Sequence, residues 1–373
     1  MMQVKPHATS STPASVSQDA PPATRISRRA ACAFVEAVLQ ALHVPADIAA
    51  DTADHLITSD SVGYASHGIS ILPHYARMLE AGDVKCDGRA QPLTDHGTWL
   101  GFDGQMGLGQ HVGKSVIAQG IARAQDKGQC VVTLKQSHHL GRLGHYGEMV
   151  ADAGLILLSF TNVVGRPPTV APYNGAEARL TTNPLCFAGP MAGGRPHFVV
   201  DFATSSMAAN KARVLASKGL QAPPNSLIDN TGHPTNDPGA LFTDPPGALL
   251  PFGAHKGYSL GLVAELLAGI LSGGGTIQPA HARGKAVRNN LFALIVAPEF
   301  AGETQWQIEE MGAFTDYLLA CKPINPEAPV QYPGQYEASN RLLNQDSIEV
   351  TAAARQELTE LGQRLDVAFP DAL

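Results

Sequence analysis

The sequence has few aromatic residues and no excess of positive charge, and both shortages narrow the range of partners. Phe, Trp and Tyr make up 6% of the 373 residues, and the formal net charge is −7. Proteins that bind nucleic acids usually carry basic surfaces and aromatic side chains that stack on bases. We therefore expect no nucleic acid partner.

Cysteine pairs and long apolar runs are also missing. The five cysteines are scattered and none forms a Cys-x-x-Cys pair, which argues against a disulfide framework and a zinc ribbon. The sequence contains no run of about 18 apolar residues, the length that a membrane-spanning helix needs. The first residues are rich in Ser, Thr, Pro and Ala and lack the apolar core of a secretory signal. We expect a cytoplasmic protein with no membrane segment and a disordered tail over residues 1–25.

What remains is a chain with a large core, since 44% of its residues are hydrophobic. Apolar runs of strand length alternate with helical periodicity, a pattern typical of the α/β class. Strands are predicted at 130–134, 155–160, 198–202 and 291–296. Helices are predicted from Ser27, from Pro45, over 145–153, over 260–271 and from about Asp346. Because the 260–271 helix is apolar on nearly all sides, we expect it to be interior. We divide the chain into a helical domain (26–95), an α/β domain (96–297) and a C-terminal helical segment (298–373) that packs back on the first domain.

A phosphate-binding glycine loop would be the usual sign of a nucleotide site in an α/β enzyme. The nearest candidate is Gly107-Leu108-Gly109, but its third glycine, Gly113, lies one residue too far along the chain, and no clear strand precedes it. A turn that opens a helix is the better interpretation.

Histidines mark two other candidate loops. In Ser66-His67-Gly68 a hydroxyl stands beside an imidazole that can relay a proton, although such a dipeptide is more often a surface or capping feature. In Ser137-His138-His139 the loop directly follows a predicted strand, where α/β proteins bind ligands. A zinc site with His145 as third ligand is the alternative, but adjacent histidines rarely chelate one ion well, so we expect no metal.

Two further segments have the chemistry of ligand contacts. His255-Lys256 lies between glycines at the start of a helix, where a phosphate could bind, or where Lys256 is only a solvated cation. Asp201 ends a predicted strand and could accept hydrogen bonds from a ribose or from a backbone turn.

Taken in order, these motifs resemble those of the malate/L-lactate dehydrogenases of the second type, a family that includes sulfolactate, ureidoglycolate and diketogulonate oxidoreductases and Δ1-piperideine-2-carboxylate reductases. The resemblance covers residues 28–370. It rests on Ser66-His67-Gly68, Leu72-Pro73-His74-Tyr75, Ser137-His138-His139-Leu140-Gly141, Thr182-Asn183-Pro184, Asp201-Phe202-Ala203-Thr204-Ser205, Pro251-Phe252-Gly253-Ala254-His255-Lys256 and Pro333-Gly334.

The resemblance implies an NAD(P)-binding α/β fold that differs from the doubly wound dinucleotide sheet, and a homodimer. It also implies a small-molecule substrate and NADH or NADPH as cofactor. The implied reaction is hydride transfer between the cofactor and a 2-hydroxy or 2-oxo acid. Reduction of a cyclic imine with a 2-carboxylate is the alternative.

The resemblance also implies roles for individual residues. His67 would be the proton donor, with Ser66 beside it and Lys211 pairing with the substrate or tuning His67. Thr182, Ala209 and Asn210 would contact the substrate. The residues implied to bind the cofactor are His139, Leu140, Gly141, Arg142, Leu143, Asp201, Phe202, Ala203, His255, Lys256, Pro333 and Gly334.

Departures from the family pattern concern the ends of the substrate and the cofactor. Many members carry an arginine four residues after the histidine, where this chain has Ile71, and we hypothesise that Arg166 supplies the missing cation. Lys211 favours a 2-oxo acid, whereas His138-His139 and His255-Lys256 look like the imine reductase versions of their motifs. The segment after Pro333-Gly334 lacks arginines suited to a 2′-phosphate, which favours NADH, although Arg142 or His255-Lys256 could serve NADPH.

Overall fold

The computed structural model describes residues 23–281 and 284–373, so most of the predicted tail lies outside the described residues. Strand β1 (Thr24–Ser27) pairs antiparallel with β12 (Ser347–Val350), which places the end of the predicted tail two residues too late. Helix α1 (Arg28–Ala41) follows directly. Its predicted cap is confirmed, because the Ser27 hydroxyl accepts the Ala30 N–H at 3.1 Å.

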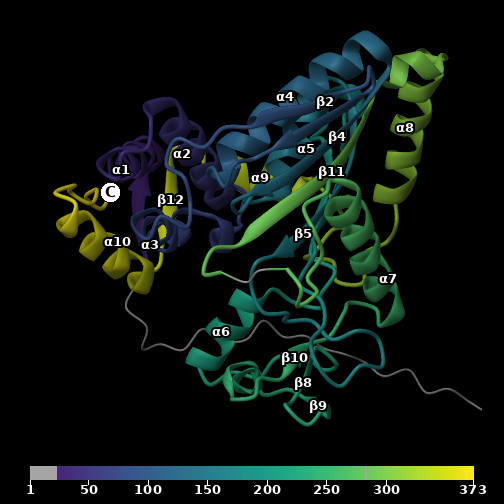
Figure 1. Cartoon of the computed structure of the whole chain (residues 1–373). Coiled ribbons are helices and arrows are strands. Elements are labelled where there is room, and N and C mark those ends of the chain that lie inside the picture. Colours follow the sequence, from purple (N-terminus) through teal and green to yellow (C-terminus); the bar gives the residue numbers. More distant parts are fainter. Residues whose placement is uncertain (1–22, 282–283) are drawn as a thin grey trace, which may run out of the picture.

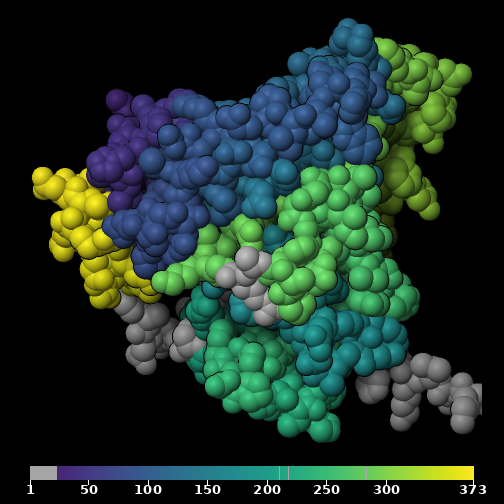
Figure 2. Space-filling view, in the orientation of Figure 1, coloured from purple at the N-terminus to yellow at the C-terminus, as the bar shows by residue number. Residues whose placement is uncertain are grey.

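The first and last helices of the described residues build one helical unit (Figure 1). Helices α1, α2 (Ala46–Ser61), α3 (Leu72–Glu80) and α10 (Ala352–Arg364) share a hydrophobic core with the β1–β12 pair. The space-filling view shows the C-terminal segment lying against the N-terminal helices (Figure 2). The C-terminal helix begins later than predicted, because residues 347–350 form β12 first.

The centre of the molecule is a seven-stranded mixed sheet in the order β2-β3-β4-β11-β5-β6-β7. The strands are β2 (Gln91–Asp95), β3 (Trp99–Asp103), β4 (Gln129–Ser137), β11 (Arg288–Val296), β5 (Ile156–Val164), β6 (Leu185–Gly189) and β7 (Phe198–Phe202). Only β3 and β4 are parallel neighbours, so this is not a doubly wound sheet. The α/β class and the four predicted strands are confirmed. The domain boundary predicted at residue 95 is wrong, because it separates β2 from its partner β3.

Side chains alternate along β11 and so build a core on each face of the sheet. Leu291, Ala293 and Ile295 pack with helices α4 (Gly109–Lys127) and α5 (Leu143–Asp152). Phe292 and Leu294 pack with helix α7 (His255–Ala264) and its π-helical continuation, Glu265–Leu271. Strand β11 is therefore covered from both sides.

The predicted interior helix is only half interior. Its sheet-facing side is buried, but Leu262, Leu266 and Ile270 are 40%, 56% and 60% exposed on the other side. Helix α8 (Thr304–Leu319) also exposes large apolar side chains, including Trp306 and Phe314. Because α8 packs near residues 192–194 and 298–301, the expectation that all of 298–373 returns to the helical unit is wrong.

A small lobe completes the described fold. It contains helix α6 (Ala209–Ser217) and a three-stranded sheet in the order β10-β8-β9. The strands are β8 (Leu227–Ile228), β9 (Pro234–Thr235) and β10 (Ala248–Leu249). The lobe lies at the bottom of Figure 1, below the central sheet. Helix α9 (Gln335–Leu343) follows Pro333 and leads the chain back to the helical unit.

Candidate active site

Ser66 and His67 lie together on a 3₁₀ turn, Ala65–His67, between α2 and α3. The Ser66 hydroxyl is 3.0 Å from Nδ1 of His67, so one ring nitrogen is occupied and Nε2 is left for a ligand. Burial first, and then the charge of Arg142, lower the pKa of His67 to about 4. His67 is therefore neutral near pH 7 and able to accept a proton.

The backbone after His67 is held by a carboxyl group from α2. Asp60 Oδ2 accepts the Ile69 N–H at 2.7 Å, and burial raises the pKa of Asp60 to about 7. A β-carbon on Gly68 would come within 2.0 Å of this carboxyl group. Only glycine therefore lets the turn approach Asp60 so closely.

His139 lies beside His67, with the two rings 26° from parallel and their centroids 5.6 Å apart. Its Nδ1 is 2.7 Å from the hydroxyl of Tyr75, and that hydroxyl also accepts from the Gln110 side-chain amide at 2.7 Å. Burial, followed by the neighbouring imidazoles of His67 and His138, lowers the pKa of His139 well below its usual range.

The other two histidines of the zinc alternative have different neighbours. His138 is fully buried against the Tyr75 ring, and His145 stacks on His55 at 4.3 Å. Within residues 23–281 and 284–373 we find no group of three His, Cys, Asp or Glu side chains that could hold a metal ion. The geometry gives the zinc alternative no support.

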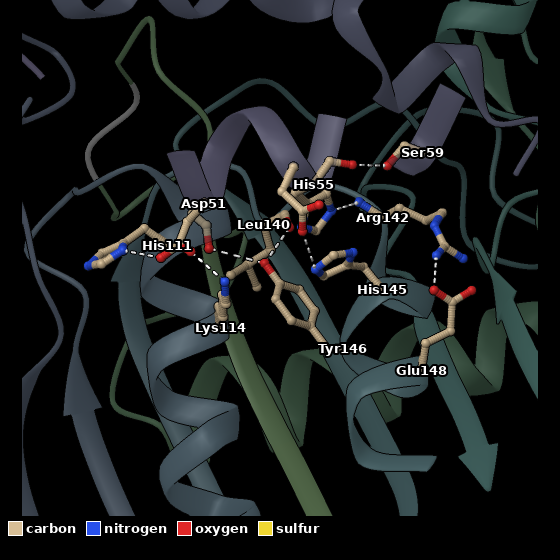
Figure 3. A network of polar contacts seen from close by, with 12 residues as sticks. Asp51, His55, Ser59, His111, Lys114, Leu140, Arg142, His145, Tyr146 and Glu148 are labelled. Atoms are coloured by element: carbon tan, nitrogen blue, oxygen red, sulfur yellow. Dashed lines mark hydrogen bonds and ion pairs between the residues drawn. The ribbon is translucent and has the colours of Figure 1, made fainter. Parts of the chain in front are cut away.

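The loop of residues 139–143 is fixed from behind by side chains of several elements (Figure 3). His55 Nε2 accepts the Arg142 N–H at 3.0 Å, and the Tyr146 hydroxyl donates to the Leu140 carbonyl at 2.7 Å. The start of α4 touches the same loop, since a β-carbon on Gly109 would lie 2.2 Å from the His139 carbonyl oxygen. This close approach explains the Gly107-Leu108-Gly109 pattern without a phosphate.

Arg142 is a buried cation beside the two histidines. Its guanidinium pairs with Glu148 at 2.8 Å and lies 5.8 Å from the centre of the Tyr64 ring, and Glu148 also binds Arg341 of α9 at 2.7 Å. Burial lowers the pKa of Arg142, but Glu148 and Asp201 outweigh it, so the net shift is upward. Nε and Nη1 of Arg142 find no hydrogen-bond acceptor among the described residues.

The four segments predicted to bind the cofactor, or residues close to them in the chain, reach the last strand of the sheet, β7. Asp201 Oδ2 accepts the N–H of Gly144, the residue after the 139–143 segment, at 2.6 Å, and Phe202 packs edge-on against Phe252, which precedes His255-Lys256, at 5.3 Å. The Pro333 carbonyl of the fourth accepts the Val199 N–H at 3.1 Å, and Gly334 then begins α9. The segments at residues 201–203 and 333–334, which are about 130 residues apart in the sequence, thus border one region.

The polar groups along this region suit an anionic dinucleotide. Exposed His255 and Lys256 open helix α7, with Tyr173 beside His255, whereas Arg142 is buried and paired with Glu148. Amide groups at a helix start and nearby cations attract phosphate. Leu143 and Ala203 complete the predicted segments, at the start of α5 and just after β7.

Cations surround the other end of the site, near Ile71. Ile71 packs against the core of the helical unit and leaves no cation at its own position. After burial, the charges of Arg166, Arg77 and Arg213 lower the pKa of His74, three residues further along. The exposed Arg166 therefore lies within electrostatic reach of α3, as the hypothesis for the missing arginine requires.

The remaining predicted substrate residues lie on two other segments of the chain. The Thr182 carbonyl accepts the Thr204 N–H at 2.9 Å, which ties its loop to the end of β7. Ala209 and Asn210 open α6, and the Asn210 side chain lies outside the described residues. Lys211 is exposed on α6, and Arg142 is the cation whose charge acts on His67.

Several side chains that shape this site have no role predicted from the sequence. Tyr75 appears there only within the Leu72-Pro73-His74-Tyr75 motif, and His55, Gln110 and Glu148 are not singled out. One signal was available for His55, because it stands among the apolar residues Ile48, Leu56 and Ile57 of α2, where a polar residue needs a partner.

Comparison with known proteins identifies the class. Residues 26–359 match the family model for malate/L-lactate dehydrogenase, and the chain belongs to that family. It is 55% identical over 348 residues to the L-lactate dehydrogenase of Cupriavidus necator, covering 93% of this chain and 100% of that one.

Solved structures agree. The sulfolactate dehydrogenase of Methanocaldococcus jannaschii superposes with a TM-score of 0.81 at 28% identity, covering 92% of this chain and 98% of that one. Δ1-Piperideine-2-carboxylate reductase of Pseudomonas syringae pvar. tomato, at 24% identity and a TM-score of 0.78 over 90% of this chain and 99% of that one, shows the fold alone. The chain is therefore an oxidoreductase that acts on hydroxy acids, with the family's fold. In the described part of the chain, no helix is long and apolar enough to cross a membrane.

Proposed function

We propose that the protein interconverts a small 2-hydroxy acid and its 2-oxo acid with NAD as cofactor. The observation that carries the proposal is the neutral His67 held by Ser66 next to the region where the four predicted cofactor segments meet. When bound, the nicotinamide supplies or accepts the hydride. The protein supplies position and a proton.

His67 is the proton-transfer residue in this proposal. In oxidation, neutral Nε2 accepts the hydroxyl proton of the substrate. In reduction, protonated His67 returns that proton to the carbonyl oxygen. The depressed pKa of His67 in the free protein favours the base form, and an anionic substrate nearby would raise that pKa.

Substrate binding is assigned to the cationic end of the site. Arg166 pairs with a carboxylate of the substrate in place of the family's usual arginine, since its charge already reaches His74. Thr182, Ala209 and Asn210 are assigned to substrate binding as the family resemblance implies, and Lys211 adds positive charge from α6.

NADH is favoured over NADPH as the cofactor. A 2′-phosphate needs a free cation, and Arg142 is already paired with Glu148. That leaves His255 and Lys256, which stand at the helix start and suit the phosphates common to both cofactors.

A homodimer accounts for the apolar surface of the sheet domain. Leu262, Leu266 and Ile270 of the α7 continuation and Trp306 and Phe314 of α8 are exposed in one chain. Large exposed apolar patches commonly mark interfaces. A cytoplasmic location is also proposed, because all five cysteines are free thiols.

The test is a panel of 2-oxo acids, 2-hydroxy acids and cyclic imines, followed by nicotinamide absorbance with NAD(H) and NADP(H). We expect turnover of a 2-hydroxy or 2-oxo acid, with NADH preferred. Turnover of the cyclic imines alone would contradict the proposed substrate class. Turnover with NADPH alone would contradict the cofactor assignment.

A further inference from the structure

Tyr75 makes the hydrogen bonds that decide where the protons lie around His139. The side chain is fully buried in the core of the helical unit, where its ring packs among apolar residues. Its hydroxyl has two partners at 2.7 Å, Nδ1 of His139 and the side-chain amide of Gln110. Both bonds have good geometry, so the hydroxyl group is fixed on both sides.

The number of hydrogens available determines the direction of each bond. The structure turns Nε2 of Gln110 towards Tyr75 and leaves Oε1 buried without a partner among the described residues, and because an amide nitrogen can only donate, the Tyr75 oxygen accepts that bond. The single hydrogen of the Tyr75 hydroxyl then goes to His139. Nδ1 of His139 is therefore an acceptor, and a neutral His139 carries its hydrogen on Nε2.

Nε2 of His139 is the donor that remains. It has no hydrogen-bond partner among the described residues, and His139 is only partly buried, whereas its neighbour His138 is fully buried. His139 and His67 stand with their rings 5.6 Å apart. A small acid with two oxygen-bearing carbons could therefore present one oxygen to each ring.

We propose that Tyr75 is a positioning residue that holds His139 as its Nε2–H tautomer, so that His139 donates a hydrogen bond to the same substrate carboxylate that Arg166 pairs with, while His67 transfers the proton. The inference about the carboxylate rests on the proposed function. The inference about the tautomer does not, because it concerns the free protein.

The first measurement is the tautomer of His139 in the full-length protein without ligand. Long-range 1H–15N correlation spectra of protein with 15N-labelled histidine distinguish a protonated from an unprotonated Nδ1, and His139→Gln assigns the signal. We expect Nδ1 of His139 to be unprotonated and Nε2 to carry the hydrogen. A hydrogen on Nδ1 would overturn the proposal, and this test needs no active-site variant to be stable.

The second measurement uses Tyr75→Phe, which removes the hydroxyl and keeps the ring. We expect the Nδ1 resonance of His139 to shift, KM for the 2-oxo acid to rise roughly tenfold and kcat to change less than about twofold, because a substrate contact has been lost. A purely structural role would instead reduce the fraction of active enzyme, lowering kcat at constant KM. An unchanged KM would contradict the proposal.

Tyr146→Phe is the matched control. Tyr146 is also buried and donates to the Leu140 carbonyl of the same loop, but it makes no hydrogen bond to a histidine ring nitrogen. We expect its removal to leave the Nδ1 resonance of His139 in place. If wild-type protein shows the predicted tautomer but turns over no 2-hydroxy or 2-oxo acid, the proposed function fails and the tautomer assignment stands.

Discussion

Two parts of the site are built on different physical principles. In the first part, His139, Tyr75 and Gln110 are neutral groups joined by hydrogen bonds inside the protein. In the second part, Arg166 and Arg213 act on His74 through their charges, and neither forms an ion pair with a carboxylate among the described residues. The hydrogen-bonded part is fixed before a ligand arrives, whereas the guanidinium groups keep their charge available for an anion.

Removing the imidazole of His67 should have the largest effect on activity. His67→Ala is expected to lower kcat by about 10²–10⁴-fold, the usual contribution of a general acid–base group. The affinity for the cofactor should change little. Steady-state kinetics and calorimetry measure both quantities, and near-normal turnover would move proton transfer elsewhere, with His139 the next candidate.

For stability, the buried ion pair between Arg142 and Glu148, which lies behind the loop of residues 139–143, should matter most. Glu148→Gln leaves Arg142 without a carboxylate partner at 2% exposure, which is expected to cost about 3 kcal/mol in the free energy of unfolding. Urea denaturation measures this change. Glu177→Gln is the control, because Glu177 forms an exposed pair with Arg179, and equal losses in the two variants would contradict the account.

Arg166→Ala should raise KM for the acid substrate roughly tenfold or more, since a charge-assisted hydrogen bond is lost. Arg179→Ala removes another exposed arginine, whose partner is Glu177, and KM should stay constant in this control. If Arg166→Ala leaves KM unchanged for every acid tested, Arg166 does not replace the missing arginine at position 71.

The charge of Arg142 should be visible in the pH dependence of activity, because it lowers the pKa of His67. Since the base form of His67 is active in oxidation, kcat/KM for oxidation should be constant near neutrality and fall as the pH drops through the pKa of about 4. Arg142→Gln removes a positive charge, so the pKa of His67 should rise and the fall should begin at higher pH. Arg341→Gln, which removes the more distant cation on Glu148, should leave the profile in place.

The smallest effect is expected for Asp60, whose carboxyl group holds the turn after His67, and it concerns thermal stability. The pKa of Asp60 in the folded protein, about 7, exceeds the usual 3.8 of the unfolded chain, so the folded state retains a proton between these values. The resulting stabilisation is full below about pH 4 and is lost as the pH rises towards 7. Asp60→Asn keeps a neutral acceptor for Ile69, so it should raise the melting temperature at pH 8 by roughly 2–5 °C and flatten its pH dependence. A lower melting temperature at pH 8 would contradict this assignment.

Local sequence patterns predicted where helices and strands form better than they predicted what packs against them. Strand β7 and the Ser27 cap follow from short-range rules, and both are present. The burial of the 260–271 helix depends on what covers its second face, and composition cannot show that one face stays exposed. Strand β12 was missed because its pairing partner, β1, lies more than 300 residues away.

The site shows the same division. Ser66-His67 could be predicted because the two residues are neighbours in the chain. The contacts that set its chemistry join distant segments, as in the bonds from Tyr75 to His139 and from Asp201 to Gly144. No local pattern encodes such pairs, so the sequence pointed to the reacting group and not to the residues that hold it.

The central claim is that this site moves a hydride between a hydroxy acid and a nicotinamide while His67 moves the proton. The most direct test incubates the protein with NAD and L-lactate carrying deuterium at carbon 2, followed by mass spectrometry of the recovered cofactor. The account predicts deuterium in the reduced cofactor with wild-type protein and at least a hundredfold slower labelling with His67→Ala. Labelling at equal rates in both proteins would contradict it.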